Sequence, residues 1–271
     1  MNKLIYPLFA LLLIVQSCKN KPEDQEEVNL DKNKLDLDIK IVEDNGIILD
    51  LESPSLNTAS VDDTLLLVVA RTYSEGDLPP ITADNWLGIY RQSEQNITVE
   101  FASLHIENVE DAFGEEGNLS AINVADIENK QAICYLKGIS GINELSFTDY
   151  SYHLKDQQLL PGESITIGGI TLVAEAGETT EYYPGFNDYH LYLKQWNDNN
   201  EMIQEILHIE YFDDAMITFY FIGDLDQDGK IDLLINESYK YSFGNPVLYL
   251  SSKARKGELV RRIGQIFLSS C

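Results

Sequence analysis

The chain has 271 residues, and its 45 Asp and Glu against 19 Lys and Arg give a formal net charge of −26. Binding to nucleic acid needs clustered basic side chains, and the one basic cluster, from Lys253 to Arg262, is small beside this excess of acids. We therefore expect no nucleic acid partner. Hydrophobic residues make up 44% of the sequence, which is enough for a real core in one large domain or two smaller ones.

The N-terminus has the pattern of a secretory signal peptide. Lys3 precedes an apolar run over residues 4–15, which Gln16, Ser17 and Cys18 follow. As a helix this run would span about 18 Å, well short of the roughly 30 Å hydrocarbon core of a bilayer. The segment therefore predicts a cleaved signal peptide rather than a membrane span.

The sequence Val15-Gln16-Ser17-Cys18 resembles the lipobox of bacterial lipoproteins. The resemblance implies that residues 1–17 are removed and that Cys18 becomes the lipidated N-terminus, which anchors the protein to a membrane. It implies a place in the bacterial cell envelope, lipid-anchored to the outer membrane, and leaves open whether the protein faces the cell surface or the periplasm. The alternative is an ordinary signal peptide in which Cys18 occurs by chance.

Residues 18–38 are polar and charged and lack apolar periodicity, so they predict a flexible acidic tether. After the tether, short runs rich in β-branched and aromatic residues alternate with turn signals such as Pro161-Gly162 and Gly168-Gly169. They predict a mainly β fold, an antiparallel sandwich or partly closed barrel, built as one domain or as two packed β subdomains.

The strands are expected in two regions, an N-terminal β region over 39–150 and a C-terminal β region over 151–271. Residues 123–129 are expected to form a short helix. The expected strands cover 39–42, 47–51, 65–73, 86–91, 97–109, 132–136, 164–167, 170–174, 189–196, 203–211, 217–222, 231–235, 246–250 and 259–267.

The chain has three cysteines. If Cys18 carries the lipid, Cys134 and Cys271 remain, and an exported protein folds in an oxidising compartment where such a pair commonly joins. We therefore expect a disulfide between Cys134 and Cys271. Two free thiols, or a Cys271 that pairs with another molecule, are the alternatives.

The segment 223–235, GDLDQDGKIDLLI, places four aspartates around Gly229. Ca²⁺ takes about six to eight oxygen ligands, and a D-x-D-x-D-G loop supplies them from alternating side chains, a later backbone carbonyl and a further carboxylate. Gly229 suits the sharp bend of such a loop because it has no Cβ. The ligands expected in the loop 224–232 are the side chains of Asp224, Asp226, Asp228 and Asp232 and the carbonyl of Lys230.

The loop does not have the features of an EF-hand, since Ile235 stands where an EF-hand keeps a bidentate Glu and both flanks have strand composition. From Asp224 to Leu233 it resembles the calcium loops of FG-GAP and VCBS-type repeats, in which D-x-D-x-D-G-x-x-D-L lies between β-strands. The resemblance implies a Ca²⁺ site between strands, and we expect a structural ion rather than a catalytic or sensing one. The sequence contains one copy, so a propeller is not implied. An Asp-rich turn without a metal is the alternative.

The runs 189–196 and 202–211 flank a turn-rich loop at 197–201 and predict a hairpin. If Trp196 lies opposite Met202, one face of the sheet carries two imidazoles and two carboxylates, because strand side chains alternate. Such a set can bind a transition metal or perform acid–base chemistry. An exposed polar face is the alternative, and a one-residue slip would separate the set. The residues concerned are Asp188, His190, His208 and Glu210.

The sequence contains no G-x-S-x-G, H-E-x-x-H or G-x-x-x-x-G-K motif, and it identifies no catalytic residue. It favours a non-enzymatic binding or structural module of the envelope, in which exposed aromatic residues such as Trp86 and Trp196 would meet a glycan or protein ligand. The alternative is an envelope hydrolase that uses carboxylates or the His190/His208 face.

Overall fold

The computed structural model describes residues 41–43, 65–74, 77–110, 121–128, 130–197 and 200–269, all of which belong to one compact unit, 37–271. The predicted signal peptide, the lipidated Cys18, the tether and Cys271 lie outside the described residues. Within the described ranges, no helix has the length and apolar character that a membrane crossing needs.

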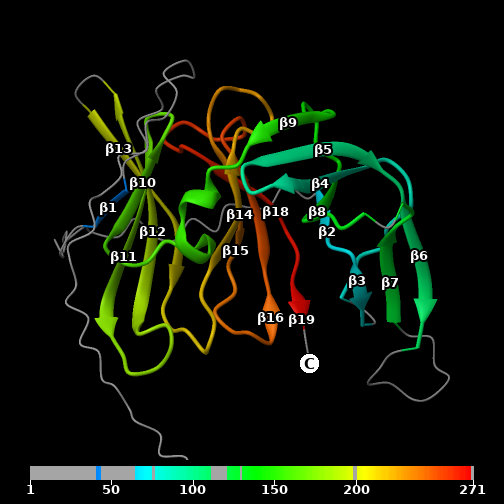
Figure 1. The fold of residues 1–271 in the computed structure, drawn as a ribbon, viewed down its shortest axis with the longest axis horizontal. Coiled ribbons are helices and arrows are strands. Elements are labelled where there is room, and N and C mark those ends of the chain that lie inside the picture. Colours follow the sequence, from blue (N-terminus) through cyan, green and yellow to red (C-terminus); the bar gives the residue numbers. More distant parts are fainter. Residues whose placement is uncertain are drawn as a thin grey trace, which may run out of the picture. The chain divides into compact units, whose positions relative to one another are not determined.

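The strands form antiparallel sheets of several sizes (Figure 1). One has the order β1 (Ile41–Glu43), β10 (Glu163–Ile167), β11 (Ile170–Thr179), β12 (Phe186–Asn197) and β13 (Asn200–Ile209). A second, the central sheet, has the order β14 (Thr218–Gly223), β15 (Asp232–Asn236), β17 (Pro246–Leu250) and β18 (Arg261–Gln265). A third has the order β2 (Leu66–Val68), β8 (Cys134–Lys137), β4 (Trp86–Ser93), β5 (Asn96–Ala102) and β9 (Leu145–Thr148).

The remaining elements are smaller. One is a three-stranded sheet with the order β3 (Arg71–Tyr73), β7 (Ala121–Asp126) and β6 (Leu104–Val109). The other is a two-stranded ribbon of β16 (Phe243–Gly244) and β19 (Leu268–Ser269). Two short 3₁₀ helices, η1 (Ser151–His153) and η2 (Lys155–Gln157), connect β9 to β10.

The prediction of a mainly β, antiparallel fold is confirmed. In the described part of the chain no sheet closes on itself, so the structure follows the layered alternative rather than the barrel. The helix expected at 123–129 is wrong, because this segment contains most of β7, whose two edges pair with β3 and β6. Pairing on both edges satisfies the backbone hydrogen bonds that a helix would otherwise make internally.

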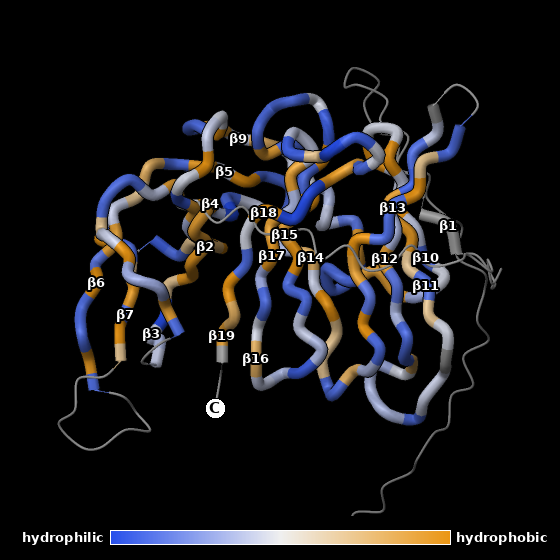
Figure 2. Tube along the Cα trace, turned by 180° about the vertical axis from the view of Figure 1, so that it is seen from behind, coloured by the Kyte–Doolittle hydropathy of each residue, from blue (hydrophilic) through white to orange (hydrophobic). Residues whose placement is uncertain are grey.

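The central sheet is buried on both faces. Successive residues of its inner strands alternate between two hydrophobic cores, with Leu234 and Leu248 in one core and Leu233 and Val247 in the other. As a result, β17 is buried at every position. A doubly covered strand needs a near-continuous apolar run rather than an alternating one, and Figure 2 shows the hydrophobic stretches of these strands.

The two cores correspond only in part to the two predicted β regions. One core joins the central sheet to strands from the N-terminal region, where Phe147 meets Phe221 edge to face at 5.3 Å. The other joins the central sheet to β10–β13. Since strands from both sides of the predicted boundary pack in the first core, and β1 pairs with β10, residues 39–150 and 151–271 are joined by a common core and by one strand pairing. Trp86, expected on the surface, is fully buried in the first core, and its indole nitrogen donates to the carbonyl of Thr82 at 2.7 Å.

A buried carboxylate connects the N-terminal strands to the central sheet. Asp149 is fully buried, and its Oδ2 lies 2.7 Å from a guanidinium nitrogen of Arg91. Its Oδ1 accepts hydrogen bonds from the backbone amides of Ser151 and Ile222 at 2.8 and 3.0 Å. A second guanidinium nitrogen of Arg91 donates to the carbonyl of Tyr220. The pair therefore links β4 and η1 to β14.

Replacing Asp149 should strongly destabilise the protein. Asp149→Ala leaves Arg91 without its anion and two amides without an acceptor, so we expect a loss of about 3–5 kcal/mol in the free energy of unfolding. Chemical denaturation measures this loss. Glu94→Ala, an exposed acid near Arg91, is the control and should change stability by less than about 0.5 kcal/mol. A similar small change for Asp149→Ala would contradict the role of the pair.

A second buried acid lies just beyond β15. Glu237 is buried, with Arg262 3.2 Å from its Oε2 and the hydroxyl of Tyr249 donating to its Oε1. Burial raises the pKa of Glu237, while Arg262 and the Tyr249 hydrogen bond partly oppose this shift. The folded chain therefore holds a proton on Glu237 more tightly than the unfolded chain does.

This shift predicts a pH-dependent contribution to stability. The contribution of Glu237 is fully present below the ordinary Glu pKa of about 4.3, and it falls as the pH rises toward the raised pKa of the folded state. Glu237→Gln cannot titrate, so the free energy of unfolding of the parent minus that of the variant should decrease with pH over this window. Denaturation at several pH values measures it, and a constant difference would refute the expectation.

Candidate functional site

The acidic loop connects the two strands β14 and β15 of the central sheet, as the sequence predicts. Gly223 ends one strand and Asp232 begins the other, and the two residues pair in the ladder. The bend at Gly229 has a φ of +84°, which is costly for residues with a Cβ. Its backbone N–H donates to Asp224 Oδ2 at 2.9 Å, so the bend also holds the first aspartate of the loop.

Three of the four predicted aspartates come together. One carboxylate oxygen from each of Asp224, Asp226 and Asp232 lies within 4.8 Å of the others. Asp226 is held by the amide of Asp228 at 3.3 Å and by a contact with the hydroxyl of Ser252. Asp224 Oδ1 is buried but has no hydrogen-bond partner, although a buried oxygen without a partner is costly. The geometry therefore leaves an acceptor that a cation would satisfy.

Asp232 is the most buried member of the group, with no exposed surface. Its Oδ2 accepts from the amide of Leu225 at 2.8 Å, and its Oδ1 accepts from the amide and hydroxyl of Ser251 at 2.8 and 3.0 Å. Burial raises the pKa of Asp232 to about 7, and the charge of Asp226 adds to the shift while the hydrogen bonds oppose it. Burial of this charge beside two more carboxylates favours a neutralising cation.

Asp228 is not part of the three-carboxylate group. Its Oδ1 accepts from the amide of Lys230 at 2.9 Å and from the hydroxyl of Ser251 at 3.1 Å, so in this structure it closes the turn. Asp228 and the Lys230 carbonyl as ligands stay predictions. Sequence reasoning missed Ser251 and Ser252, because they follow β17 and reach the loop only through the pairing of β15 with β17.

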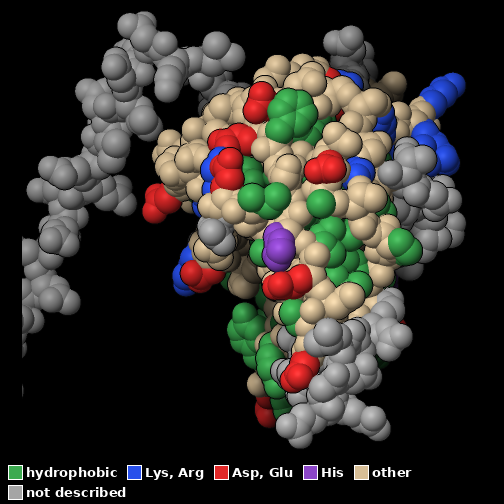
Figure 3. All heavy atoms as spheres, turned by 90° about the vertical axis from the view of Figure 1, so that its right-hand side faces the viewer, with side chains coloured by type: hydrophobic (Ala, Val, Ile, Leu, Met, Phe, Trp, Pro, Cys, Tyr) green, Lys and Arg blue, Asp and Glu red, His purple; other side chains and the backbone are tan. Residues whose placement is uncertain are grey.

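Among the hollows at the surface of the described residues, two bear on the site. One, of about 570 Å³, adjoins the acidic loop and is lined by Asp228 and Ser251 together with Lys230, Arg255 and Lys256. The other, of about 720 Å³, is lined by residues that include Tyr90, Phe101, Asp126, Ile127 and Lys130. Phe101 and Ile127 are largely exposed. Figure 3 shows one face of the molecule, on which hydrophobic side chains and carboxylates are interspersed.

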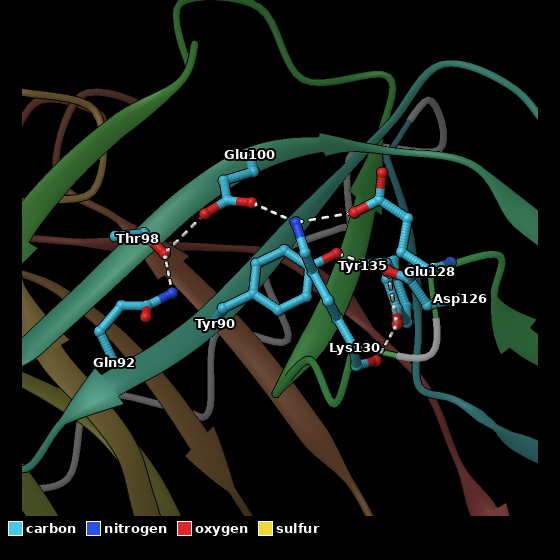
Figure 4. A network of polar contacts seen from close by, with 8 residues as sticks. All are labelled: Tyr90, Gln92, Thr98, Glu100, Asp126, Glu128, Lys130 and Tyr135. Atoms are coloured by element: carbon cyan, nitrogen blue, oxygen red, sulfur yellow. Dashed lines mark hydrogen bonds and ion pairs between the residues drawn. The ribbon is translucent and has the colours of Figure 1, made fainter.

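Several polar side chains in and beside the larger hollow contact one another (Figure 4). The Tyr90 hydroxyl donates to Asp126 Oδ2 at 2.6 Å, and the amide of Glu128 donates to Asp126 Oδ1 at 2.7 Å. Lys130 bridges Glu100 and Glu128 at 2.8 and 2.9 Å. Burial and the neighbouring Asp126 raise the pKa of Tyr90, so this hydroxyl keeps its proton. The network therefore favours a structural role for these side chains in the wall of the hollow over a reactive one.

The predicted hairpin forms from β12 and β13, although its loop end differs from the prediction. Gln195, rather than Trp196, lies opposite Met202, which is a shift of one residue. A β-bulge between Leu191 and Tyr192 reverses this shift farther along the strands. Trp196 is 70% exposed, as the sequence predicts for an aromatic residue at the surface.

Beyond the bulge, His190 lies opposite His208, in agreement with the predicted register. Asp188 contacts both imidazoles, at 3.2 Å from His190 Nε2 and 2.8 Å from His208 Nε2. Glu210 meets Asp188 through its backbone carbonyl. The second carboxylate that contacts an imidazole is that of Glu205, 2.9 Å from His190 Nδ1, which sequence reasoning missed because the bulge was not visible in the residue spacing.

Cys134 has no exposed surface and forms no disulfide with another described residue. Its predicted partner, Cys271, lies outside the described residues, so the disulfide stays a prediction.

Comparisons with protein-family models, with curated proteins and with solved structures find no match to this chain. The function of this chain is therefore inferred from the geometry of its acidic loop.

The bend at Gly229 should be sensitive to a Cβ. Gly229→Ala forces Ala into a left-handed conformation, which we expect to cost about 1–2 kcal/mol. Gly141, with a φ of +96° and equally open surroundings, is the matched control, and Gly141→Ala should cost a similar amount. Only Gly229→Ala should also weaken Ca²⁺ binding, because Gly229 holds Asp224. Denaturation with and without Ca²⁺ measures both effects, and equal Ca²⁺ responses would contradict this role.

Proposed function

We propose that this chain is a lipid-anchored protein of the bacterial envelope whose central sheet is stabilised by a Ca²⁺ ion bound at the loop 224–232, and that it serves as a non-enzymatic binding or structural module. The observation that carries the proposal is the buried, unpartnered Oδ1 of Asp224 beside the carboxylates of Asp226 and Asp232. The lipid anchor at Cys18 and the location at the outer membrane rest on the N-terminal sequence alone.

The donor set favours Ca²⁺. All three grouped side chains offer carboxylate oxygens, which suit hard cations such as Ca²⁺, Mg²⁺ and Mn²⁺ rather than soft ones. Among these, Ca²⁺ tolerates flexible, irregular coordination with a high ligand number, whereas Mg²⁺ demands near-ideal octahedral geometry and retains waters. A loop that offers several carboxylates and backbone carbonyls in a short stretch suits the less demanding ion.

A structural role for the ion follows from the position of its ligands. Asp232 begins β15 and also binds Ser251 just after β17, so a cation there neutralises a charge at the end of two paired central strands. An ion that binds the folded chain and not the unfolded one raises stability by mass action.

The two hollows support a binding module over a purely structural one. The hollow beside the acidic loop has basic residues in its wall, and the larger one is bordered by exposed Phe101 and Ile127. Such surfaces suit a glycan or a protein ligand, in which apolar faces stack on side chains and polar groups bind at the rim. The alternative, a hydrolase that uses carboxylates or the His190/His208 face, stays a prediction.

Calcium should stabilise the full chain in proportion to its free concentration relative to Kd. At about ten times Kd the free energy of unfolding should rise by about 1.4 kcal/mol, which corresponds to roughly 3–6 °C in Tm for a chain of this size. Thermal unfolding in chelator and then in rising Ca²⁺ measures this.

Asp224→Asn should abolish most of this gain, because it removes a charged oxygen from the group while the amide oxygen can still accept from Gly229. Asp84→Asn, at an exposed position, is the control and should respond to Ca²⁺ as the parent does. A parent that shows no shift, or an Asp224→Asn variant that responds in full, would rule out the loop as the site.

A further inference from the structure

A second cluster of metal-ligating side chains lies on the sheet β10–β13, a different sheet from the one that carries the acidic loop. Three atoms, Asp188 Oδ1, His190 Nε2 and His208 Nε2, converge there, with the two histidines 3.2 and 2.8 Å from the same carboxylate oxygen. The imidazole rings are stacked, with centroids 4.2 Å apart and planes 8° from parallel. Both nitrogens therefore point the same way, toward one carboxylate.

His190 contacts two carboxylates, and a neutral imidazole can donate a hydrogen bond to only one of them. Its Nδ1 lies 2.9 Å from Glu205 Oε1 and its Nε2 lies 3.2 Å from Asp188 Oδ1. A neutral imidazole carries one N–H, so it can donate to only one of these two carboxylates, and its other nitrogen presents a lone pair to the second. With the proton on Nδ1, a cation between His190 Nε2 and Asp188 turns this repulsive contact into an attractive one.

The backbone builds this arrangement with two local irregularities. Asp188 has a φ of +53°, in the left-handed region that Asp tolerates better than most residues. A Cβ on Gly177, in the neighbouring strand β11, would collide with Asp188 Oδ2, so the glycine makes room for the carboxylate. The bulge between Leu191 and Tyr192 brings Glu205 to the same side as His190.

We infer that Asp188, His190 and His208 form a binding site for a transition-metal ion, with Zn²⁺ as the natural occupant. Zn²⁺ binds imidazole and carboxylate at about 2.0–2.2 Å in a tetrahedron, whose edges are then about 3.3 Å long. The contacts of 2.8 and 3.2 Å from Asp188 to the two histidines are close to or somewhat shorter than this edge, and the nearly parallel rings must turn toward each other for both Nε2 lone pairs to point at one ion.

Glu205 completes the site as a positioning residue. Metal-bound histidines commonly donate their second ring nitrogen to a carboxylate, which fixes the tautomer and the ring orientation. Glu205 is mostly buried and stands 2.9 Å from His190 Nδ1, in the place that such a partner occupies. Three protein ligands leave the fourth position of the tetrahedron for water or an anion. Asp188 is 44% exposed, which gives an ion a path from solvent.

The two sites should differ in the ions that they select. The acidic loop offers oxygen atoms alone, whereas the hairpin offers two imidazole nitrogens, which suit Zn²⁺, Cu²⁺ and Ni²⁺ better than Ca²⁺. Excess Ca²⁺ should therefore fill the loop and leave the hairpin free. This difference allows the two proposals to be tested separately on the same protein.

The test is a calorimetric titration of Zn²⁺ into the full chain at neutral pH in excess Ca²⁺. The parent should bind one Zn²⁺ per chain, and Co²⁺ at the same site should give the absorption spectrum of a tetrahedral ion. Glu205→Gln should weaken Zn²⁺ binding by about 10–100-fold, as expected for an outer carboxylate partner, and His208→Ala should weaken it further. Gly177→Ala should also weaken binding, because its Cβ displaces Asp188.

Two variants serve as controls. His105→Ala removes an exposed imidazole that contacts only a carboxylate on its own strand, and it should bind Zn²⁺ as the parent does. Asp224→Asn should also bind Zn²⁺ normally, whatever it does to Ca²⁺, so failure of the calcium proposal leaves this one standing. Circular dichroism confirms that each variant is folded. Absence of Zn²⁺ binding by the parent, or unchanged binding by a folded His190→Ala/His208→Ala variant, would overturn the inference.

Discussion

Burial of the central sheet on both faces is the constraint from which the other features follow. Strands β15 and β17 send alternate side chains into two separate cores, and the charged residue of these strands, Asp232, lies at the end of β15. Polar chemistry is therefore confined to the ends of the strands and to the loops beyond them. Burial of apolar surface in such a sheet supplies much of the stability of a β protein. In this chain the central sheet also packs against strands of both predicted β regions.

The buried acids around this sheet are neutralised in different ways. Asp149 and Glu237 each have an Arg within ion-pair distance, namely Arg91 and Arg262. For Asp232 the described hydrogen bonds come from amides and a hydroxyl, and its nearest charged neighbours in the cluster are carboxylates. Among the described residues no Arg takes this part at Asp232, and the cation proposed for the acidic loop would neutralise its buried charge. The acidic composition of the chain favours cations in the same way.

The hairpin β12–β13 shows how one extra residue changes a polar face. In the register that pairs His190 with His208, strict period-two alternation would place Glu205 on the opposite face from His190, and the bulge brings it to the same face. With the bulge, Glu205 joins the imidazoles while the apolar side chains of Leu191 and Leu207 remain in the core. β-bulges are common next to functional sites because they redirect one side chain without disturbing the sheet. A cluster of imidazoles and carboxylates can thus form on the polar face of a sheet.

The sequence by itself determined the features that depend on short-range spacing: the β class, the loop between β14 and β15 with its bend at Gly229, and the hairpin of β12 and β13, whose predicted pairing of His190 with His208 holds only because the bulge offsets a one-residue error at the loop end. Each is set by residues a few positions apart or by strand alternation across one hairpin. The tertiary structure alone decided the burial of Trp86, the strand at 121–126, the contacts of Ser251 with the acidic loop and the approach of Glu205 to His190. These depend on pairing between distant segments and on a bulge, and neither leaves a periodic signal in the residues concerned, because packing with distant strands overrides local preference.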